Sequence, residues 1–347
     1  MRRNLTVASA LATVLVSLGA CLSCGASSPP PAVPLSSAPE PAVSPPARPQ
    51  LPGTVVVLGG SPEGVAVDRS GEAAVNVRQP NGLVIFDLAA PTRRRTIALD
   101  GSARHLSLVG PDGPLLIPDE SDDRLVEVAL PSGQVLDSIP VGRQPHDAAA
   151  AAARTVFVGD ELTNTIHVIR DGTVTRVIPA PLQPGGLAAS PDGSVVVAVG
   201  VRGRRISAYR SDGSLIGSAN CGAGPTHVVT GTGGLYWVVD TNGGAVLAFR
   251  VGARGPRQVA AIPVGSRPYG VAYDARRATL WVTLTGTDQL VGLRLLGTAV
   301  KSRLIYATVQ QPNTVAVAES TGEVVVTGST PEGAVQLIGS SGLVGSP

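Results

Sequence analysis

The chain has 347 residues, with 27 Lys and Arg, 25 Asp and Glu, and a formal net charge of +2 at pH 7. A charge this close to zero argues against nucleic-acid binding, which needs a strongly basic surface. Hydrophobic residues make up 43% of the chain and charged residues only 15%, which excludes disorder along the whole length. The three cysteines are too few for a scaffold built on many disulfides.

The N-terminus has the pattern of an export signal. Arg2 and Arg3 form a basic start, and residues 5–20 form an apolar stretch without charge. This stretch of about 16 residues is shorter than the ~20 that span a membrane, and it matches the apolar core of a signal peptide. The pattern predicts a signal peptide over residues 1–20 and a protein exported from the cytoplasm.

The signal ends in Leu18-Gly19-Ala20-Cys21, which resembles a bacterial lipobox. In a lipobox the chain is cleaved before the cysteine and a lipid is attached to it, so the resemblance implies acylation (palmitate or a similar chain) at Cys21. Each buried acyl methylene contributes about 0.8 kcal/mol to membrane attachment. Lipidation at Cys24, an ordinary secretory signal and an uncleaved anchor are the alternatives.

A Pro-rich spacer follows the signal. Ten prolines occur in the 24 residues from Pro29 to Pro52, and only Glu40 and Arg48 are charged there. Because proline fixes φ and lacks the N–H that helices and sheets need, the segment is expected to be extended and unpacked. At ~3.1 Å per residue it reaches up to ~75 Å. Residues 21–53 are therefore predicted to be the lipidated cysteine and a disordered tether.

From residue 54 onward the sequence repeats. Each unit has a short apolar strand, a turn, a second strand rich in β-branched residues, a polar loop, and a third and fourth strand. No segment shows sustained helical periodicity with caps. Four short strands per unit predict an all-β fold, a seven-bladed β-propeller with four-stranded blades. The seven units, spaced by 39–44 residues, start at Pro62, Ala103, Pro145, Pro184, Pro225, Pro268 and Pro312.

The two ends of the repeat region complement each other. The seventh unit has three strands and ends at Val335–Ile338, whereas residues 55–60 match the fourth-strand position and its closing glycine. We expect this N-terminal strand to form the outer strand of the last blade, which closes the ring and removes an open sheet edge. The propeller is thus predicted over residues 54–338, with a C-terminal tail over 339–347.

Several phrases recur between units, and through them the chain resembles a known repeat. Examples are Phe157-Val158-Gly159-Asp160 with Asn164-Thr165-Ile166-His167-Val168-Ile169, and the junctions Gly142-Arg143-Gln144-Pro145 and Gly265-Ser266-Arg267-Pro268. These resemble the YVTN repeat of bacterial seven-bladed propellers, the YncE-like group. The chain departs from this repeat at Ala103 and in the Arg202–Arg205 loop. The resemblance implies the fold but not the function, because propellers include binding modules, scaffolds and lactonases.

Polar residues gather on one predicted face of the ring. Antiparallel topology places the junctions before the first strands on the same face as the loops between second and third strands, and we call this face the rim. The tether joins the start of a fourth strand, so we expect it to emerge on the opposite face. The polar rim positions are Glu63, Arg104, His105, Asp119, His146, Asp147, Asp160, His227, Asp240, Tyr269 and Asn313.

These side chains are suited to three kinds of site. A cluster of Arg, His and Asp can bind a polar or anionic ligand, coordinate a metal, or supply a general base. For catalysis the candidates are Glu63, Arg104 and His146, and the other eight positions form a candidate ligand-binding rim. The alternative without a functional site is that Asp and Asn in such loops form hydrogen bonds with their own backbone. HExxH and GxSxG motifs are absent.

We therefore predict a lipoprotein anchored outside the cytoplasm through Cys21. Its propeller is interpreted as a monomeric binding or scaffold module for an envelope protein or a small ligand. A lactonase-like hydrolase or a metal-binding protein at the rim is the alternative. No cofactor is predicted, and a bound metal ion is kept as an alternative. Cys221 is interpreted as a structural thiol, with a disulfide to Cys24 as the alternative.

Overall fold

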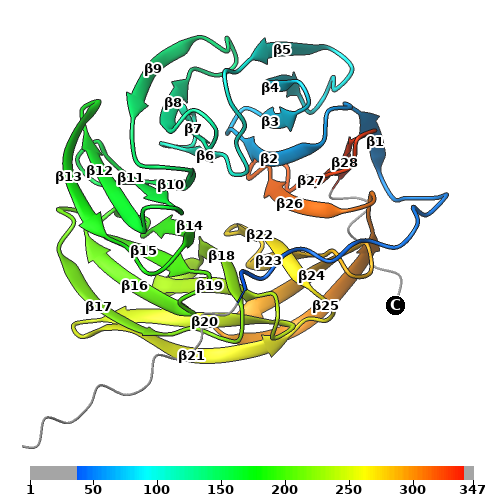
Figure 1. Cartoon of the computed structure of the whole chain (residues 1–347). Helices are drawn as coiled ribbons and strands as arrows, with labels where there is room; N and C mark the ends of the chain where they lie inside the picture. Colours follow the sequence, from blue (N-terminus) through cyan, green and yellow to red (C-terminus); the bar gives the residue numbers. More distant parts are fainter. Residues whose placement is uncertain (1–36, 340–347) are drawn as a thin grey trace, which may run out of the picture. The chain divides into compact units, whose positions relative to one another are not determined.

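The computed structural model describes residues 37–339. Over these residues the chain forms seven four-stranded antiparallel sheets arranged as blades around a central channel (Figure 1). The predicted all-β, seven-bladed propeller is confirmed. The signal peptide, Cys21, Cys24 and all but the first residue of the tail lie outside the described residues.

The strands of blades one to six run in order from the channel to the outside. Blade one is β2 (Pro62–Val67), β3 (Glu72–Arg78), β4 (Asn81–Asp87) and β5 (Arg94–Ala98), and blade two is β6 (Ser107–Leu108), β7 (Leu115–Asp119), β8 (Arg124–Val128) and β9 (Val135–Pro140). Blade three is β10 (Pro145–Ala151), β11 (Thr155–Asp160), β12 (Thr165–Arg170) and β13 (Thr173–Pro179), and blade four is β14 (Pro184–Ala189), β15 (Val195–Gly200), β16 (Arg205–Arg210) and β17 (Leu215–Asn220). Blade five is β18 (Pro225–Thr230), β19 (Leu235–Asp240), β20 (Ala245–Gly252) and β21 (Gly255–Pro263), and blade six is β22 (Pro268–Asp274), β23 (Thr279–Leu284), β24 (Gln289–Leu296) and β25 (Ala299–Ala307). Blade seven is β26 (Pro312–Val317), β27 (Val324–Gly328), β28 (Ala334–Ile338) and β1 (Thr54–Val57), and a 3-10 turn, η1 (Thr232–Gly234), precedes β19.

The ring closes as predicted. β1 pairs antiparallel with β28, from Thr54 opposite Leu337 to Val57 opposite Ala334. Blade seven therefore combines the first described strand of the chain with the last three. This pairing gives both ends of the propeller a hydrogen-bonded neighbour, so the blade has the same four strands as the other six.

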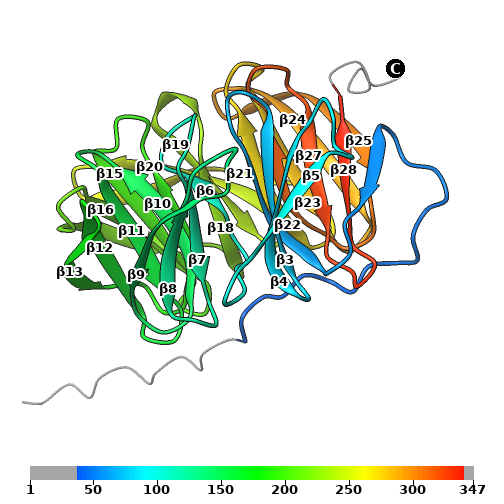
Figure 2. The same ribbon diagram turned by 90° about the horizontal axis from the view of Figure 1, so that it is seen from above.

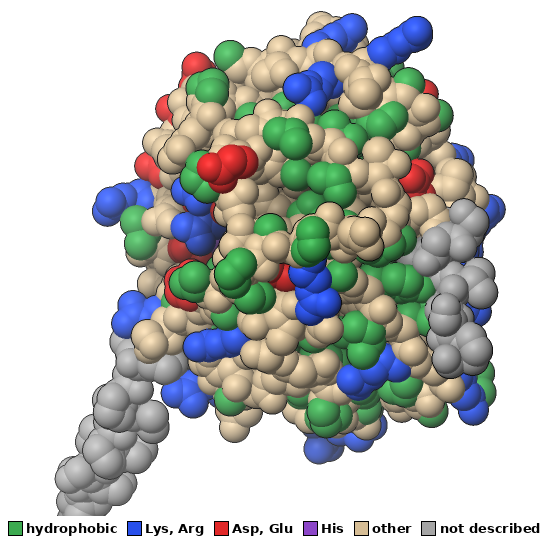
Figure 3. Space-filling model, turned by 90° about the vertical axis from the view of Figure 1, so that its right-hand side faces the viewer, with side chains coloured by type: hydrophobic (Ala, Val, Ile, Leu, Met, Phe, Trp, Pro, Cys, Tyr) green, Lys and Arg blue, Asp and Glu red, His purple; other side chains and the backbone are tan. Residues whose placement is uncertain are grey.

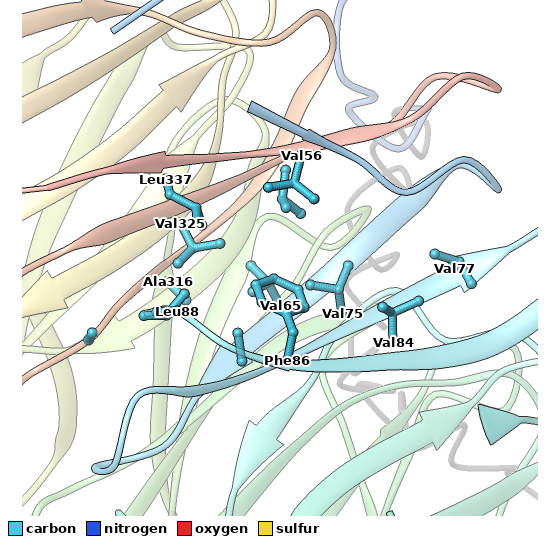
Figure 4. Packing of buried hydrophobic residues seen from close by; sticks show 13 residues of the cluster. Val56, Val65, Val75, Val77, Val84, Phe86, Leu88, Ala316, Val325 and Leu337 are labelled. Atoms are coloured by element: carbon cyan, nitrogen blue, oxygen red, sulfur yellow. The ribbon is translucent and has the colours of Figure 1, made fainter. Parts of the chain in front are cut away.

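The hydrophobic core lies between neighbouring blades. The second strands β11, β19 and β23 are buried along their whole length, since each is covered on both faces by the adjacent blades. This explains why consecutive residues in the middle of each strand are apolar, as in Val156–Val158, Leu235–Val239 and Leu280–Val282, a pattern that an alternating half-exposed strand would not show. Between blades seven and one, Val56 of β1 packs in a cluster with Val65, Phe86 and Val325 (Figure 4).

The first strand of blade two is shorter than expected. The apolar phrase from Ala103 to Leu108 forms only the two-residue β6. Ala103 is held instead by the neighbouring blade, because the side-chain amide of Asn76 donates a hydrogen bond to its carbonyl at 2.7 Å. The departure from the repeat at this junction therefore coincides with a different set of backbone contacts.

The outer surface shows no large single-sign region on the side seen in Figure 3, where acidic, basic and apolar side chains are interspersed. This agrees with the small net charge. Within residues 37–339 there is no helix that is long and apolar enough to cross a membrane.

The described part of the Pro-rich segment is packed against the ring. We call residues 37–45 the strap. Ser44 Oγ donates to the carbonyl of Thr285 at 2.8 Å, Ala42 N donates to Thr285 Oγ1 at 2.9 Å, and Gln311 Nε2 donates to the carbonyl of Ala42 at 2.8 Å. Thr285 and Gln311 lie in loops of the rim. Figure 2 shows the strap, in blue, running along one face of the ring.

The strap corrects two expectations for these residues. It is extended and has no helix or strand, as proline requires, but it is not unpacked. The chain also does not stay on the face opposite the rim, because it turns back from β1 onto the rim. The physical reason is that an extended proline-rich backbone keeps its carbonyl groups free to accept hydrogen bonds, and glutamine side chains of the rim supply the donors.

Replacing Gln311 by alanine is expected to loosen the strap. The change removes the hydrogen bonds of Gln311 to Ser44 N and to the Ala42 carbonyl, each of which contributes about 1 kcal/mol. Together they amount to about 2 kcal/mol, so hydrogen exchange of the strap amides is expected to rise up to roughly 30-fold. Gln258→Ala, on the exposed outer strand β21, is the control. Equal exchange in both variants would mean that these bonds do not hold the strap.

Candidate functional site

Three of the four histidines meet in the central channel. His146 comes from β10 and His227 from β18, while His105 lies just before β6. The imidazole centroid of His105 is 4.8 Å from that of His146 and 4.4 Å from that of His227. The first strands of all blades line the channel, so equivalent positions in distant repeats become neighbours. The structure thus brings these three predicted rim residues together.

Two cavities flank the histidines. The mouth cavity, of about 340 Å³, opens on the rim, and its lining includes Arg104, His146, His227, Tyr269 and the strap residue Glu40. A second cavity of about 160 Å³ lies along the channel and is lined by His105, Asp147, His227 and apolar residues of the first strands. His227 lines both cavities, so the histidines stand between the mouth and the channel.

A buried charged network forms one wall of the mouth cavity. Glu120 accepts a hydrogen bond from His146 Nδ1 at 2.8 Å through Oε1, and its Oε2 lies 3.2 Å from Arg104 Nε. Glu161 Oε1 is 3.4 Å from the same nitrogen of His146. Two carboxylates therefore balance one guanidinium and one imidazole.

The pKa values of the network follow from burial and pairing. Burial lowers the pKa of His146, but Glu161 and Glu120 outweigh it and raise the pKa above its usual value. Burial raises the pKa of Glu120, yet the hydrogen bond and charge of His146 lower it overall. The shifts of the two partners agree, because both favour a charged Glu120–His146 pair.

The pKa values of the other two histidines, His227 and His105, are lowered. Burial lowers the pKa of His227 to about 4, and burial together with the neighbouring imidazoles lowers the pKa of His105 well below its usual value. His227 Nδ1 donates to the carbonyl of Tyr269 at 2.8 Å, and its ring meets the ring of Tyr269 edge-on. Both imidazoles are therefore neutral at pH 7.

The predicted catalytic set is divided between two places. Arg104 and His146 share the mouth cavity. Glu63 lines another cavity on the rim, where Ser329 Oγ donates to its Oε1 at 2.9 Å and Arg78 Nη1 lies 3.5 Å from the same oxygen. Asn313 lies with Glu63, since its amide is 3.4 Å from Glu63 Oε2.

The aspartates that end the second strands, Asp119, Asp160 and Asp240, and Asp147 of β10 make structural contacts. Asp119 accepts from the amide of Gly101 at 2.9 Å, and Asp240 accepts from the amide of Gly224 at 2.7 Å. Asp160 pairs with His167 Nδ1 at 2.7 Å, and Asp147 accepts from the amide of Leu187 in the next blade at 2.7 Å. These contacts hold junctions and neighbouring blades in place.

Asp119 is expected to make stability depend on pH. Burial raises its pKa to about 6, above the ~3.9 of an unfolded chain, so its contribution is fully present below pH 4 and is lost as pH rises through 6. Between pH 4 and 7 the unfolding free energy of the wild type should fall by up to about 3 kcal/mol relative to that of Asp119→Asn. Urea unfolding at several pH values measures this, and parallel curves would contradict it.

Cys221 is expected to be chemically inert in the folded chain. Its side chain is 0% exposed and free, and burial raises the pKa of its thiol. Alkylation by iodoacetamide should be at least about 100-fold slower in the native chain than in urea, because the thiolate is the reactive form. Peptide mapping of the labelled site measures this. Rapid native labelling at Cys221 would contradict the expectation.

Three residues of the mouth were missed in the sequence. Glu120 and Glu161 each follow the aspartate that ends a second strand, and this repeated Asp-Glu pair in blades two and three was the available signal. Glu40 reaches the mouth cavity only through the strap, and nothing local in the sequence indicates that contact.

Similarity to solved structures is confined to the fold. The chain is similar to virginiamycin B lyase from Staphylococcus aureus (TM-score 0.67, 14% identity, 82% of this chain and 99% of that chain) and to hydrazine synthase of Kuenenia stuttgartiensis (0.67, 16%, 82% and 97%). It is also similar to a chain of a mitotic checkpoint complex (0.70, 12%, 83% and 94%). No family model matches the sequence, and no curated protein matches it either. These neighbours define a class by architecture, the β-propellers, and not by activity.

Proposed function

We propose that the chain is a YVTN-type, YncE-like envelope lipoprotein whose propeller binds a small polar ligand at its rim. The anchor rests on the sequence of residues 1–21. The full chain is expected in the detergent phase of a phase-partition experiment, and Cys21→Ser should move it to the aqueous phase. Partition unchanged by Cys21→Ser but lost with Cys24→Ser would reassign the lipid to Cys24.

The mouth cavity is the observation that carries the binding function. Its volume of about 340 Å³ suits a small molecule. Arg104, His146, Glu120 and Glu161 place paired charges in or beside its wall. A cavity with balanced, buried polar groups favours a polar solute with both donors and acceptors over an apolar one. Its lining includes rim loops of blades three and four, such as Leu162 and Leu182, so it is reachable from the rim.

A bulky residue at the mouth tests this function. Leu182 lines the cavity, and Leu182→Trp should fill part of it without removing a polar group. Sugars, amino acids, dicarboxylates and lactones are screened by thermal shift, and at least one is expected to stabilise the wild type but not this variant. Leu215→Trp, at an exposed position of β17, is the matched control. A compound that stabilises the wild type, Leu182→Trp and Leu215→Trp equally would bind outside the mouth cavity.

Hydrolysis is the second candidate, and the Glu120–His146 pair favours it. A carboxylate on Nδ1 orients the imidazole and raises its pKa, so that the other nitrogen can give up its proton as a general acid and take one back as a general base. Turnover of lactones by the full chain, abolished by His146→Gln and retained by Glu63→Gln, would assign hydrolysis to the mouth cavity. Turnover that is unchanged by His146→Gln would remove this candidate.

A further inference from the structure

The three channel histidines are spaced like an open metal site. The ligand nitrogens of His105, His146 and His227 all lie within 4.8 Å of one another. Around one ion with metal–nitrogen distances of ~2.1 Å, tetrahedral ligands stand about 3.4 Å apart. The nitrogens need to approach by at most about 1.4 Å, which is within reach of side-chain rotation in a cavity. Three separate blades supply the ligands, so the ring itself holds them together.

Two of the histidines are oriented for coordination. His146 Nδ1 donates to Glu120, and His227 Nδ1 donates to the carbonyl of Tyr269, each at 2.8 Å. Metal-binding histidines usually donate one ring N–H to a carboxylate or a backbone carbonyl, which fixes the tautomer and leaves the other nitrogen for the ion. The Nε2 atoms of His146 and His227 accept no hydrogen bond from the residues that the structure describes.

His105 completes the set as the adjustable ligand. It is half-buried beside the channel cavity, and its ring contacts the rings of both His146 and His227. Neither of its nitrogens has a hydrogen-bond partner among residues 37–339. Rotation of this side chain therefore breaks no hydrogen bond.

The charged groups around the three histidines are compatible with a bound cation. Arg104 is the nearest permanent positive charge, but Glu120 lies 3.2 Å from its Nε. Glu161 adds a second carboxylate 3.4 Å from His146 Nδ1. Coordination needs the neutral imidazole, so the ion displaces the Nε2 proton of His146; the two carboxylates then outnumber the guanidinium of Arg104 and favour a cation at the histidines. The two cavities leave room for a fourth ligand such as water.

We propose that His105, His146 and His227 bind one divalent transition-metal ion between the mouth and the channel. Three imidazoles with an open fourth position suit Cu²⁺ or Zn²⁺ and do not suit Ca²⁺ or Mg²⁺, which prefer oxygen ligands. Cu²⁺ is expected to bind more tightly than Zn²⁺, in the general order of affinities. This site goes beyond the polar-ligand function and does not depend on it.

The test titrates Cu²⁺ and Zn²⁺ into the full chain in detergent after removal of metal with a chelator, in competition with a chromophoric chelator. One tightly bound ion per chain is expected, with nitrogen couplings in the Cu²⁺ electron paramagnetic resonance spectrum. His105→Asn and His227→Asn should each weaken binding at least 10-fold, in line with the loss of a metal ligand.

His167→Asn is the matched control. His167 is the fourth histidine of the chain, and its Nδ1 pairs with Asp160 outside the cluster, so the variant should bind the ion as the wild type does. His105→Asn is the decisive variant because it removes no hydrogen bond, and circular dichroism checks that it is folded. Binding lost equally in His167→Asn, retained in folded His105→Asn, or absent from the wild type would overturn the proposal.

Discussion

Replacing Val56 by aspartate is expected to cost about 3–5 kcal/mol of unfolding free energy, because a buried charge would have no partner. Val56 is 8% exposed and lies in the cluster that joins blades seven and one. It is also on β1, the strand that closes the ring. A loss of this size is a large fraction of the stability of an ordinary domain. Chemical denaturation followed by tryptophan fluorescence measures it.

The neighbouring residue provides a matched control on the same strand. Val57 is 63% exposed, so Val57→Asp introduces the same charge into water and should change stability by less than about 0.5 kcal/mol. Both variants have the same pairing partner, β28. Equal effects of the two substitutions would show that β1 does not pack against the ring as described.

Glu120→Ala is the second change with a large expected effect, about 3 kcal/mol of unfolding free energy. The carboxylate holds His146 and Arg104 at 2.8 and 3.2 Å, and removing one partner of a buried pair leaves the other charge uncompensated. Glu161 still lies 3.4 Å from His146 Nδ1, which places the loss at the lower end of the usual range. Thermal and urea unfolding measure it.

Glu127→Ala controls for the loss of a glutamate in the same blade. Glu127 lies on β8, and the nearby carboxylate of Asp137 repels it; burial and this repulsion both raise its pKa. Its removal should change stability by less than about 1 kcal/mol. If Glu120→Ala were as mild as Glu127→Ala, the network at the mouth would contribute little to the fold.

The fold was predictable from the sequence because the repeat is strong. Seven junctions at near-constant spacing identify the blades, and the unpaired fourth strand at residues 55–60 indicates how the ring closes. Burial of the second strands between blades produces the apolar runs that mark them in the sequence. Blade two shows the limit, since Asn76 holds Ala103 from another blade and no local pattern reveals such a contact.

The site was only partly predictable. The position of each residue within its repeat followed from the strand order, and this placed His105, His146 and His227 on the rim. Which rim residues meet in space depends on how the seven first strands surround the channel. Glu63 is therefore predicted to lie with Arg104, although it contacts Arg78 and Ser329. The strap was predicted to be unpacked because proline content indicates an extended chain but not what that chain contacts.

The closing strand also sets an order of events during synthesis. β1 is made before any other strand of the propeller, whereas its partner β28 is made last. Thr54–Val57 must therefore remain without its sheet neighbour while about 280 residues are added, and at 5–20 residues per second this takes roughly 14–56 seconds. A chain that stops before residue 334 has no edge to receive β1 and leaves Val56 in water. The pairing of β1 with β28 therefore forms only in chains that have been synthesised through the last strand.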